Sequence, residues 1–144
     1  MTNRESHLTN ADLRITRQRQ LILDEFKRNN THLTADDVYE RVKRRLPRVS
    51  LGTIYRNLEI LSECGLIRKV ELAGNQKKFD GNTGKHYHIR CIKCDRLEDI
   101  PAASVKIEMP EPLQNIGYEI VRYRLEIMGI CPRCRAESTT GQEP

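Results

Sequence analysis

The sequence predicts an α+β protein: a winged helix-turn-helix domain followed by a smaller, strand-rich domain. Three stretches with helical apolar spacing precede two short strand-like stretches, which is the order of a winged helix. Four of the five cysteines form two CxxC pairs, both beyond residue 80. Residues 1–80 hold 16 Lys and Arg against 11 Asp and Glu, whereas residues 81–144 hold nine of each. We therefore expect domains over residues 1–83 and 84–144, the second ending in a polar tail.

The composition excludes some classes of protein and favours others. No run of apolar residues is long enough to span a membrane. The N-terminal residues are polar and lack the apolar core of a secretory signal, so we expect a cytoplasmic protein with no membrane partner. The net charge of +5 falls entirely in the first half, which indicates a polyanionic partner. An ordinary solvated surface explains the charge equally well.

Capping residues and apolar spacing predict the first two helices. Thr16 can cap a helix over residues 17–29, and a further short helix over about 10–14 could precede it. Thr34 can cap the second helix, and Pro47 ends it. The apolar stripe of this second helix consists of Val38, Val42 and Leu46.

The third helix and the wing follow directly. Ser50 can cap a helix over residues 51–64, and Gly65 suits the left-handed position that ends it. Its core-facing residues are spaced by three, four and three, and are Leu51, Ile54, Leu58 and Leu61. The wing is then expected as a strand, a turn and a return strand, over residues 66–72, 73–75 and 76–80.

The second domain is expected to begin after a linker rich in Gly and Asn, residues 81–84. Strands are predicted over residues 86–91 and 97–101. A short helix over about 110–116 should end at Gly117, and a long strand over 118–130 should follow. The last ten residues are polar, and we expect them to fray.

The two CxxC pairs give the strongest chemical signal. Two intervening residues allow both sulfur atoms of a pair to reach one tetrahedral ion, and four thiolates leave no open position for a substrate. We therefore expect one structural Zn(II) ion, bound by Cys91, Cys94, Cys131 and Cys134. Four free thiols or a redox dithiol are the weaker alternatives. Cys64 stands apart, and a small buried apolar side chain explains it better than a reactive thiol.

A second set of candidate ligands surrounds the predicted junction between the domains. His86 and His88 are two residues apart on a predicted strand, so both imidazoles face one side. Asp80 lies just upstream, and Asp99 lies on the next strand. Such a mixed nitrogen and oxygen set suits Fe(II), Mn(II) or Zn(II). A pair of surface histidines without a metal is the alternative.

The outward face of the third helix indicates contact with DNA. Residues near the start of a recognition helix approach base edges, so the candidates are Ser50, Gly52, Thr53, Tyr55 and Arg56. Arg56 suits a guanine or a phosphate, and Tyr55 offers an apolar edge to a thymine methyl group. Glu59 and Glu63 lie further along the helix, where distance from phosphate is favourable. An ordinary amphipathic helix is the alternative.

The chain resembles the ferric uptake regulator family, most of all its peroxide-sensing branch. The segments that show the resemblance are residues 14–19, 32–39, 50–58, 85–94 and 124–127 with the second CxxC pair. It implies a winged helix and a C-terminal α/β dimerisation domain. It also implies a five-ligand regulatory site for Fe(II) or Mn(II), made by His32, Asp80, His86, His88 and Asp99, in which His32 and His86 are the residues oxidised.

The chain also departs from the family pattern. Iron-uptake members usually carry Glu where Asp80 and Asp99 stand here. Further histidines of those members are replaced here by Lys85, Tyr87, Arg122 and Tyr123, so we expect a third metal site of some relatives to be missing. Arg56 is shared more with the iron-uptake branch, which leaves the choice of operator open.

The resulting hypothesis is a homodimeric, metal-dependent transcriptional repressor that is not an enzyme. It would bind operator DNA when its regulatory metal is bound, and peroxide would release it by oxidising a ligand histidine. Peroxide would be a signal, and no other small-molecule substrate is expected. A regulator that senses the level of iron, zinc or manganese directly is the main alternative. A metal-dependent hydrolase and a metal-stabilised interaction module are the others.

Overall fold

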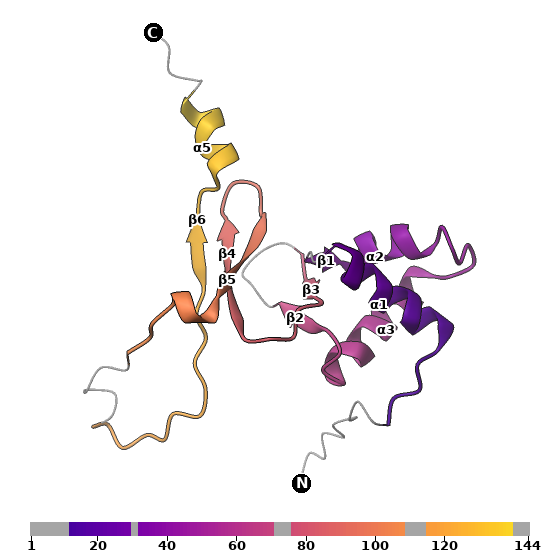
Figure 1. Ribbon diagram of the computed structural model, residues 1–144, viewed down its shortest axis with the longest axis horizontal. Helices are drawn as coiled ribbons and strands as arrows, with labels where there is room; N and C mark the ends of the chain where they lie inside the picture. Colours follow the sequence, from indigo (N-terminus) through magenta and orange to yellow (C-terminus); the bar gives the residue numbers. More distant parts are fainter. Residues whose placement is uncertain (1–11, 30–31, 71–75, 109–114, 140–144) are drawn as a thin grey trace. The chain divides into compact units, whose positions relative to one another are not determined.

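A computed structural model describes residues 12–29, 32–70, 76–108 and 115–139. The chain consists of two compact units that divide between Gly84 and Lys85, and each unit is described by itself. Helices and small antiparallel or mixed sheets occur in both, which confirms the α+β class (Figure 1). No helix among the described residues is long and apolar enough to cross a membrane.

The first unit contains three helices and a three-stranded sheet. Its elements are α1 (Arg17–Asn29), β1 (Leu33–Thr34), α2 (Ala35–Val42), α3 (Leu51–Glu63), β2 (Arg68–Val70) and β3 (Lys78–Asp80). The strand order is β1-β3-β2, and both pairings are antiparallel. The turn predicted over residues 73–75 lies outside the described residues, as does most of the short helix considered before α1. Asp12–Thr16, the described part of that region, is not helical.

Side-chain caps fix where the first two helices begin. The Thr16 hydroxyl accepts a hydrogen bond from the backbone N–H of Arg19 at 3.3 Å. At α2, Thr34 and Asp37 form a reciprocal capping box, with N···O distances of 3.1 and 2.9 Å. Helix α2 ends at Val42, about one turn earlier than predicted. Leu46 lies in the turn after the helix and still packs against the core. Its N–H donates a hydrogen bond to the Val42 carbonyl at 2.9 Å, which keeps it in line with the apolar stripe of the helix.

Helix α3 begins and ends as its sequence predicts. The Ser50 hydroxyl accepts a hydrogen bond from the Thr53 N–H at 3.1 Å, and Gly65 adopts φ +74° just beyond the helix. Cys64, beside it, is buried as a small apolar side chain. The first unit contains the hydrophobic core, whose fully buried side chains include Ile22, Val38, Val42, Ile54, Leu58, Leu61 and Phe79.

The second unit contains β4 (His86–Cys91), β5 (Leu97–Pro101), the short helix η1 (Ala102–Ser104), β6 (Ile127–Gly129) and α5 (Pro132–Thr139). The sheet has the order β5-β4-β6, with β4 antiparallel to β5 and parallel to β6. Beyond Gly84, the residues of the described ranges that are buried are Cys91 and Cys134. The described part of this unit therefore lacks an apolar core comparable to that of the first.

Two predictions for the second unit are wrong. The strand expected over residues 118–130 is limited to Ile127–Gly129, because residues 118–126 pair with no strand in the described part of the chain. The polar tail was expected to fray from residue 135, but α5 extends to Thr139. Pro132 suits the first turn of this helix, and Cys134 is its buried residue. The helix predicted over 110–116 lies mostly outside the described residues, and residues 115–117 form a turn that ends at Gly117.

Candidate functional site

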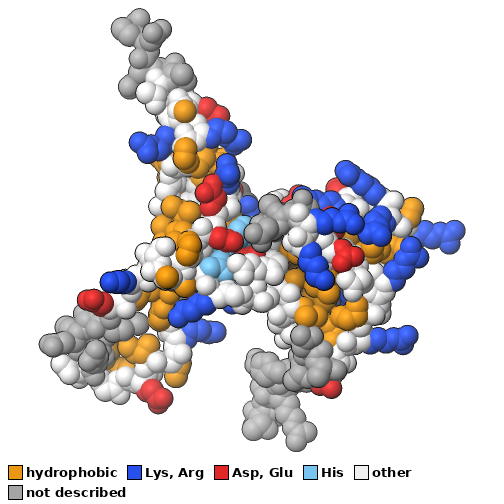
Figure 2. Space-filling view, viewed as in Figure 1, with side chains coloured by type: hydrophobic (Ala, Val, Ile, Leu, Met, Phe, Trp, Pro, Cys, Tyr) orange, Lys and Arg blue, Asp and Glu red, His pale blue; other side chains and the backbone are white. Residues whose placement is uncertain are grey.

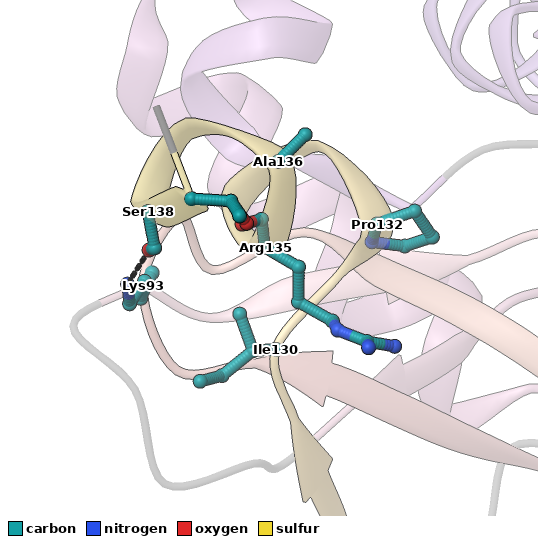
Figure 3. A pocket seen from close by; sticks show the side chains of 7 residues that line it. Lys93, Ile130, Pro132, Arg135, Ala136 and Ser138 are labelled. Carbon is teal, nitrogen blue, oxygen red and sulfur yellow. Dashed lines mark hydrogen bonds between the residues drawn. The ribbon is translucent and has the colours of Figure 1, made fainter. Parts of the chain in front are cut away.

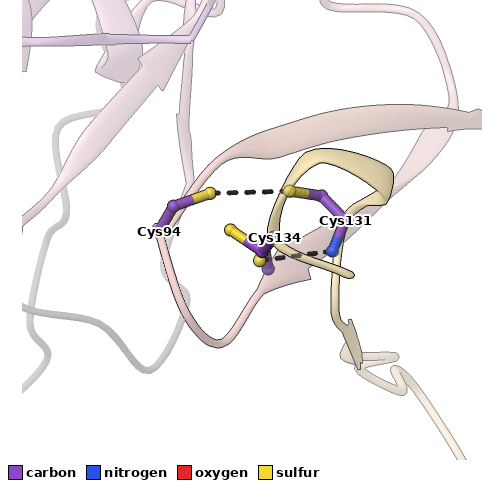
Figure 4. A group of neighbouring side chains, drawn as sticks. Cys94, Cys131 and Cys134 are labelled. Carbon is purple, nitrogen blue, oxygen red and sulfur yellow. Dashed lines mark hydrogen bonds between the residues drawn. The ribbon is translucent and has the colours of Figure 1, made fainter. Parts of the chain in front are cut away.

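The four cysteines of the CxxC pairs form one cluster in the second unit (Figure 4). Their sulfur atoms lie within 4.8 Å of one another, and the sulfur atoms of Cys94 and Cys131 are 3.8 Å apart. The turn after β4 supplies one pair, and the start of α5 supplies the other. The parallel pairing of Cys91 with Gly129 brings the two pairs together across the 36 intervening residues.

The surroundings of these cysteines shift the pKa values of two of the thiols in opposite directions. Backbone N–H groups, that of Cys131 first, donate to the Cys91 sulfur and lower its pKa to about 6. Hydrogen bonding to the Cys131 sulfur and burial raise the pKa of Cys134 to about 12. The cluster therefore favours the thiolate form of Cys91 and disfavours the thiolate form of Cys134. A bound divalent cation would stabilise the thiolate form of both. Four thiolates at tetrahedral spacing are the donor set of structural zinc.

A pocket of about 530 Å³ lies beside the cysteine cluster (Figure 3). It is lined by Lys93, Ile130, Pro132, Arg135, Ala136, Ser138 and Thr139. The Lys93 ammonium donates to the Ser138 hydroxyl, which bonds the Cys134 carbonyl at 2.9 Å and so ties α5 to the first CxxC turn. Among the lining residues that the structure describes, the polar side chains are two cations and two hydroxyls, Lys93, Arg135, Ser138 and Thr139.

The first unit places an imidazole against a carboxylate at the edge of its sheet. Leu33 pairs with Phe79 across β1 and β3, so their neighbours His32 and Asp80 lie side by side. The His32 Nε2 and Asp80 Oδ2 atoms are 3.4 Å apart. The other carboxylate oxygen of Asp80 accepts the Asn82 N–H at 2.8 Å. Spacing along the chain could not reveal His32 as a candidate, because only the β1–β3 register brings it to Asp80.

The second unit gathers two imidazoles and a carboxylate on one face of its sheet. His86 and His88 alternate along β4, and their Nε2 atoms are 3.0 Å apart. Asp99 lies directly opposite His88 in the β4–β5 register. Its Oδ1 atom is 3.5 Å from His86 Nε2 and 3.3 Å from His88 Nε2. Two nitrogen atoms and one oxygen atom thus converge on one point, as ligands of a borderline divalent ion do.

The exposed face of α3 carries the predicted nucleic-acid contacts. Gly52, Tyr55 and Arg56 are exposed, and a Cβ atom at Gly52 would meet nothing nearer than the Ser50 hydroxyl at 4.0 Å. Ser50 and Thr53 bond one another at 2.8 Å, so their hydroxyls are partly engaged by the cap. Figure 2 shows Lys and Arg side chains spread over this unit.

Basic side chains also line a hollow of about 430 Å³ in the first unit. The lining combines the end of α1 with the end of α2 and the turn after it, and consists of Glu25, Arg28, Arg41, Arg44 and Arg45. Arginine forks suit phosphate oxygens, so this surface adds to the basic character of the unit.

Several contacts of α3 could not be read from the sequence. The buried side chain of Asn57 accepts a hydrogen bond from Arg19 Nε at 3.0 Å and donates to Gln18 at 3.4 Å, which fixes α3 against α1. Glu59 binds two lysines of the wing, Lys69 at 2.6 Å and Lys77 at 2.8 Å. These partners are distant in sequence, and no local pattern indicates them.

A pair of tyrosines occupies positions at which the family resemblance implied extra histidines. The hydroxyls of Tyr87 in β4 and Tyr123 are 2.7 Å apart, and this hydrogen bond raises the pKa of Tyr87. The pair fastens Tyr123, in the segment 118–126, to β4 through a hydrogen bond between the two hydroxyls.

A winged helix joined to a small α/β unit with a four-cysteine cluster and a histidine–aspartate set defines a metal-responsive transcriptional regulator. The ferric uptake regulator family model matches residues 10–128. The chain belongs to this family.

Individual relatives cover nearly the whole chain. The peroxide-responsive repressor of Staphylococcus epidermidis is 33% identical over 131 residues, which are 90% of this chain and 87% of that protein. The solved ferric uptake regulator of Francisella tularensis with iron is 28% identical, with a TM-score of 0.70 over 89% of this chain and 98% of that one. The Campylobacter jejuni peroxide stress regulator is 30% identical, with a TM-score of 0.65 over 81% and 88%.

Proposed function

We propose that this protein is a dimeric, metal-dependent repressor that binds operator DNA with its regulatory ion in place and leaves it after reaction with peroxide. One observation carries the proposal. Ligand groups stand on both sides of the short connection over residues 81–85, and one set belongs to the unit that contains α3. A ligand that engages both sets would fix the angle between the two units.

The proposed regulatory site combines the two sets. Its five ligands are His32, Asp80, His86, His88 and Asp99, and Fe(II) or Mn(II) fits their three nitrogen and two oxygen donors. When bound, the ion would supply positive charge and, as Fe(II), an electron that starts the cleavage of peroxide and that the imidazole returns as it is oxidised. The protein's own contribution is to hold imidazoles at the point where this reaction occurs.

The proposed DNA contacts are those of α3. In a symmetric dimer, two such helices must reach half-sites about 34–36 Å apart, or a multiple of that spacing. Arg56 and Tyr55 would read base edges, with Gly52 allowing close approach and Ser50 and Thr53 at the helix start. The second copy would cover the segment 118–126, in which Tyr118 is 77% exposed and Val121 is 89% exposed. In the dimer, a strand of the second copy could pair with this segment and extend the sheet.

Release by peroxide is proposed to result from a covalent change at His32 or His86. One oxygen atom of peroxide ends on the imidazole ring, and the other leaves as water. The modified ring is bulkier and less basic, so the five ligands cannot return to one ion. The angle between the units is then no longer held, and operator affinity falls.

The remaining parts of the proposal follow from the same features. The four cysteines would hold a structural Zn(II) ion that keeps the second unit folded. We place the protein inside the cell and assign it no enzymatic reaction, since five protein ligands leave little space for a substrate at the regulatory site.

The test compares the dimer loaded with Fe(II) and with Mn(II), each on an operator duplex. After mild peroxide, the Fe(II) form should gain the mass of one oxygen atom on peptides containing His32 or His86, and should lose operator binding in step. The Mn(II) form should keep both its mass and its binding. If the Fe(II) form stays on DNA unoxidised while metal depletion alone releases it, the protein senses metal level directly. Loss of sequence-specific binding in every form would refute a repressor role.

A further inference from the structure

A carboxylate lies on the outward face of α3, one turn beyond the proposed DNA-reading residues. Glu59 follows Arg56 by three positions, so the two side chains are neighbours on the helix surface. A carboxylate here would repel the phosphate backbone and would attract Arg56 away from DNA. Among the described residues, however, Arg56 has no ion-pair partner.

Glu59 is instead engaged by the wing. Its Oε2 atom is 2.6 Å from the Lys69 ammonium in β2, and its Oε1 atom is 2.8 Å from the Lys77 ammonium, just before β3. The three side chains are 34%, 26% and 44% exposed, so they are accessible to a large ligand. Partial burial opposes ionisation of Glu59, but the hydrogen bonds from both lysines outweigh it and lower its pKa. Both carboxylate oxygens are therefore occupied at neutral pH.

This arrangement determines which charges the wing can offer. Lys69 and Lys77 are already paired with one carboxylate, so a phosphate would compete with Glu59 for either ammonium. The pairing also leaves Arg56 available, because the nearest acid on its helix face is already bound. The same three residues would thus weaken contact with the DNA backbone and leave Arg56 available for bases.

We propose that Glu59 withholds Lys69 and Lys77 from the DNA backbone and so limits binding that is independent of sequence. The inference rests on the operator binding proposed above. It makes Glu59 a specificity-determining residue that acts through the wing, and it assigns the phosphodiester backbone as the ligand that the two lysines would otherwise take.

The consequence is measurable through salt dependence. Each lysine that gains a phosphate should steepen the slope of log K against log salt by about 0.9. Release of Lys69 should therefore steepen the slope by about 0.9, and release of both lysines by up to about 1.8. Either release should raise affinity for duplex of random sequence more than affinity for the operator. Discrimination between the two duplexes then falls.

The experiment uses the full-length Mn(II)-loaded dimer with an operator duplex and a random duplex of equal length, over a range of salt. Glu59→Gln removes the charge and keeps the shape of the side chain. Glu63→Gln is the matched control, because it removes an equal charge from the same helix at an exposed residue that has no ion pair with any described residue. The double variant E59Q/K69Q tests the lysine itself, and thermal melting confirms that each variant is folded.

A steeper slope and tighter random-duplex binding in E59Q, with smaller effects in E63Q, support the inference. A slope in E59Q/K69Q that is less steep than that of E59Q by about 0.9 supports it further. Equal effects in E59Q and E63Q overturn it, because net charge alone then explains the change. Weaker binding by E59Q also overturns it, since Glu59 would then present the lysines or read a base. If the wild-type dimer binds no duplex, the repressor function fails and this inference fails with it.

Discussion

Substitution of one cysteine in the zinc cluster tests how the second unit is held together. We expect Cys131→Ser to unfold this unit at temperatures at which the wild-type protein is folded. Among the described residues of the unit, the buried ones are Cys91 and Cys134, so the sulfur cluster takes the place of an apolar core. Binding of zinc is then a main source of folding free energy.

The size of the effect follows from this architecture. A structural zinc site contributes about 10–16 kcal/mol at neutral pH, so an equal share for one thiolate of four is about 2.5–4 kcal/mol. Typical stability for sixty residues is about 3–9 kcal/mol, even with a full core. The loss is thus comparable to the whole stability of the unit, and it should lower the melting temperature by about 10–32 °C.

The assay combines zinc analysis, mass in solution and calorimetry on the full chain. Cys64→Ser is the matched control, because Cys64 is 7% exposed, belongs to the first unit and lies outside the cluster. The control should keep its zinc and the melting of the second unit, whereas Cys131→Ser should lose both and dimerise poorly. If Cys131→Ser binds one zinc ion per chain and melts as wild type does, the reasoning is wrong.

Three further outcomes are expected in the first unit. Arg56→Ala should cost about 1–3 kcal/mol of operator binding and relax preference at one base position, and an unchanged affinity for all duplexes would exclude contact. Asn57→Leu should lower the free energy of unfolding in urea by about 1–3 kcal/mol, because Arg19 and Gln18 lose their partner; an unchanged midpoint would refute this. The folded pKa of Glu59 lies below 4.5, so its ion pairs stabilise the fold above that pH and are lost as pH falls through the lowered value. The melting difference between wild type and E59Q should therefore shrink in acid, and a growing difference would contradict the assignment.

Elements with local signals could be predicted from the sequence. Helices α1 and α3 begin and end within one residue of the predicted positions, because Thr16, Ser50 and Gly65 act through neighbours in the chain. The strand over residues 118–130 could not be predicted correctly, since a strand depends on a partner that pattern alone does not supply. The same holds for the early end of α2, where Leu46 packs equally well from a turn.

The residues of the candidate site also fall into two groups, those with a local sequence signal and those brought together only by the fold. The CxxC spacing and the alternation of His86 and His88 are local, so the sequence indicates those residues directly. His32 was named only through the family resemblance, because the register of Leu33 with Phe79 brings it to Asp80. The bonds from Glu59 to two wing lysines depend on how α3 packs against a hairpin, and periodicity along one helix carries no such information.

The connection between the units begins at a fixed point. A Cβ atom at Gly81 would stand 2.8 Å from the Cβ atom of Phe26. Glycine therefore allows the backbone just after β3 to pack directly against the core residue Phe26. The free tether is thereby shortened to a few residues, and a short tether keeps two weak partial ligand sets at an effective concentration of about millimolar to each other. The proposed regulatory site is in this sense a chelate whose affinity depends on chain length as well as on its ligands. Added residues between Gly81 and His86 should weaken metal binding although every ligand remains.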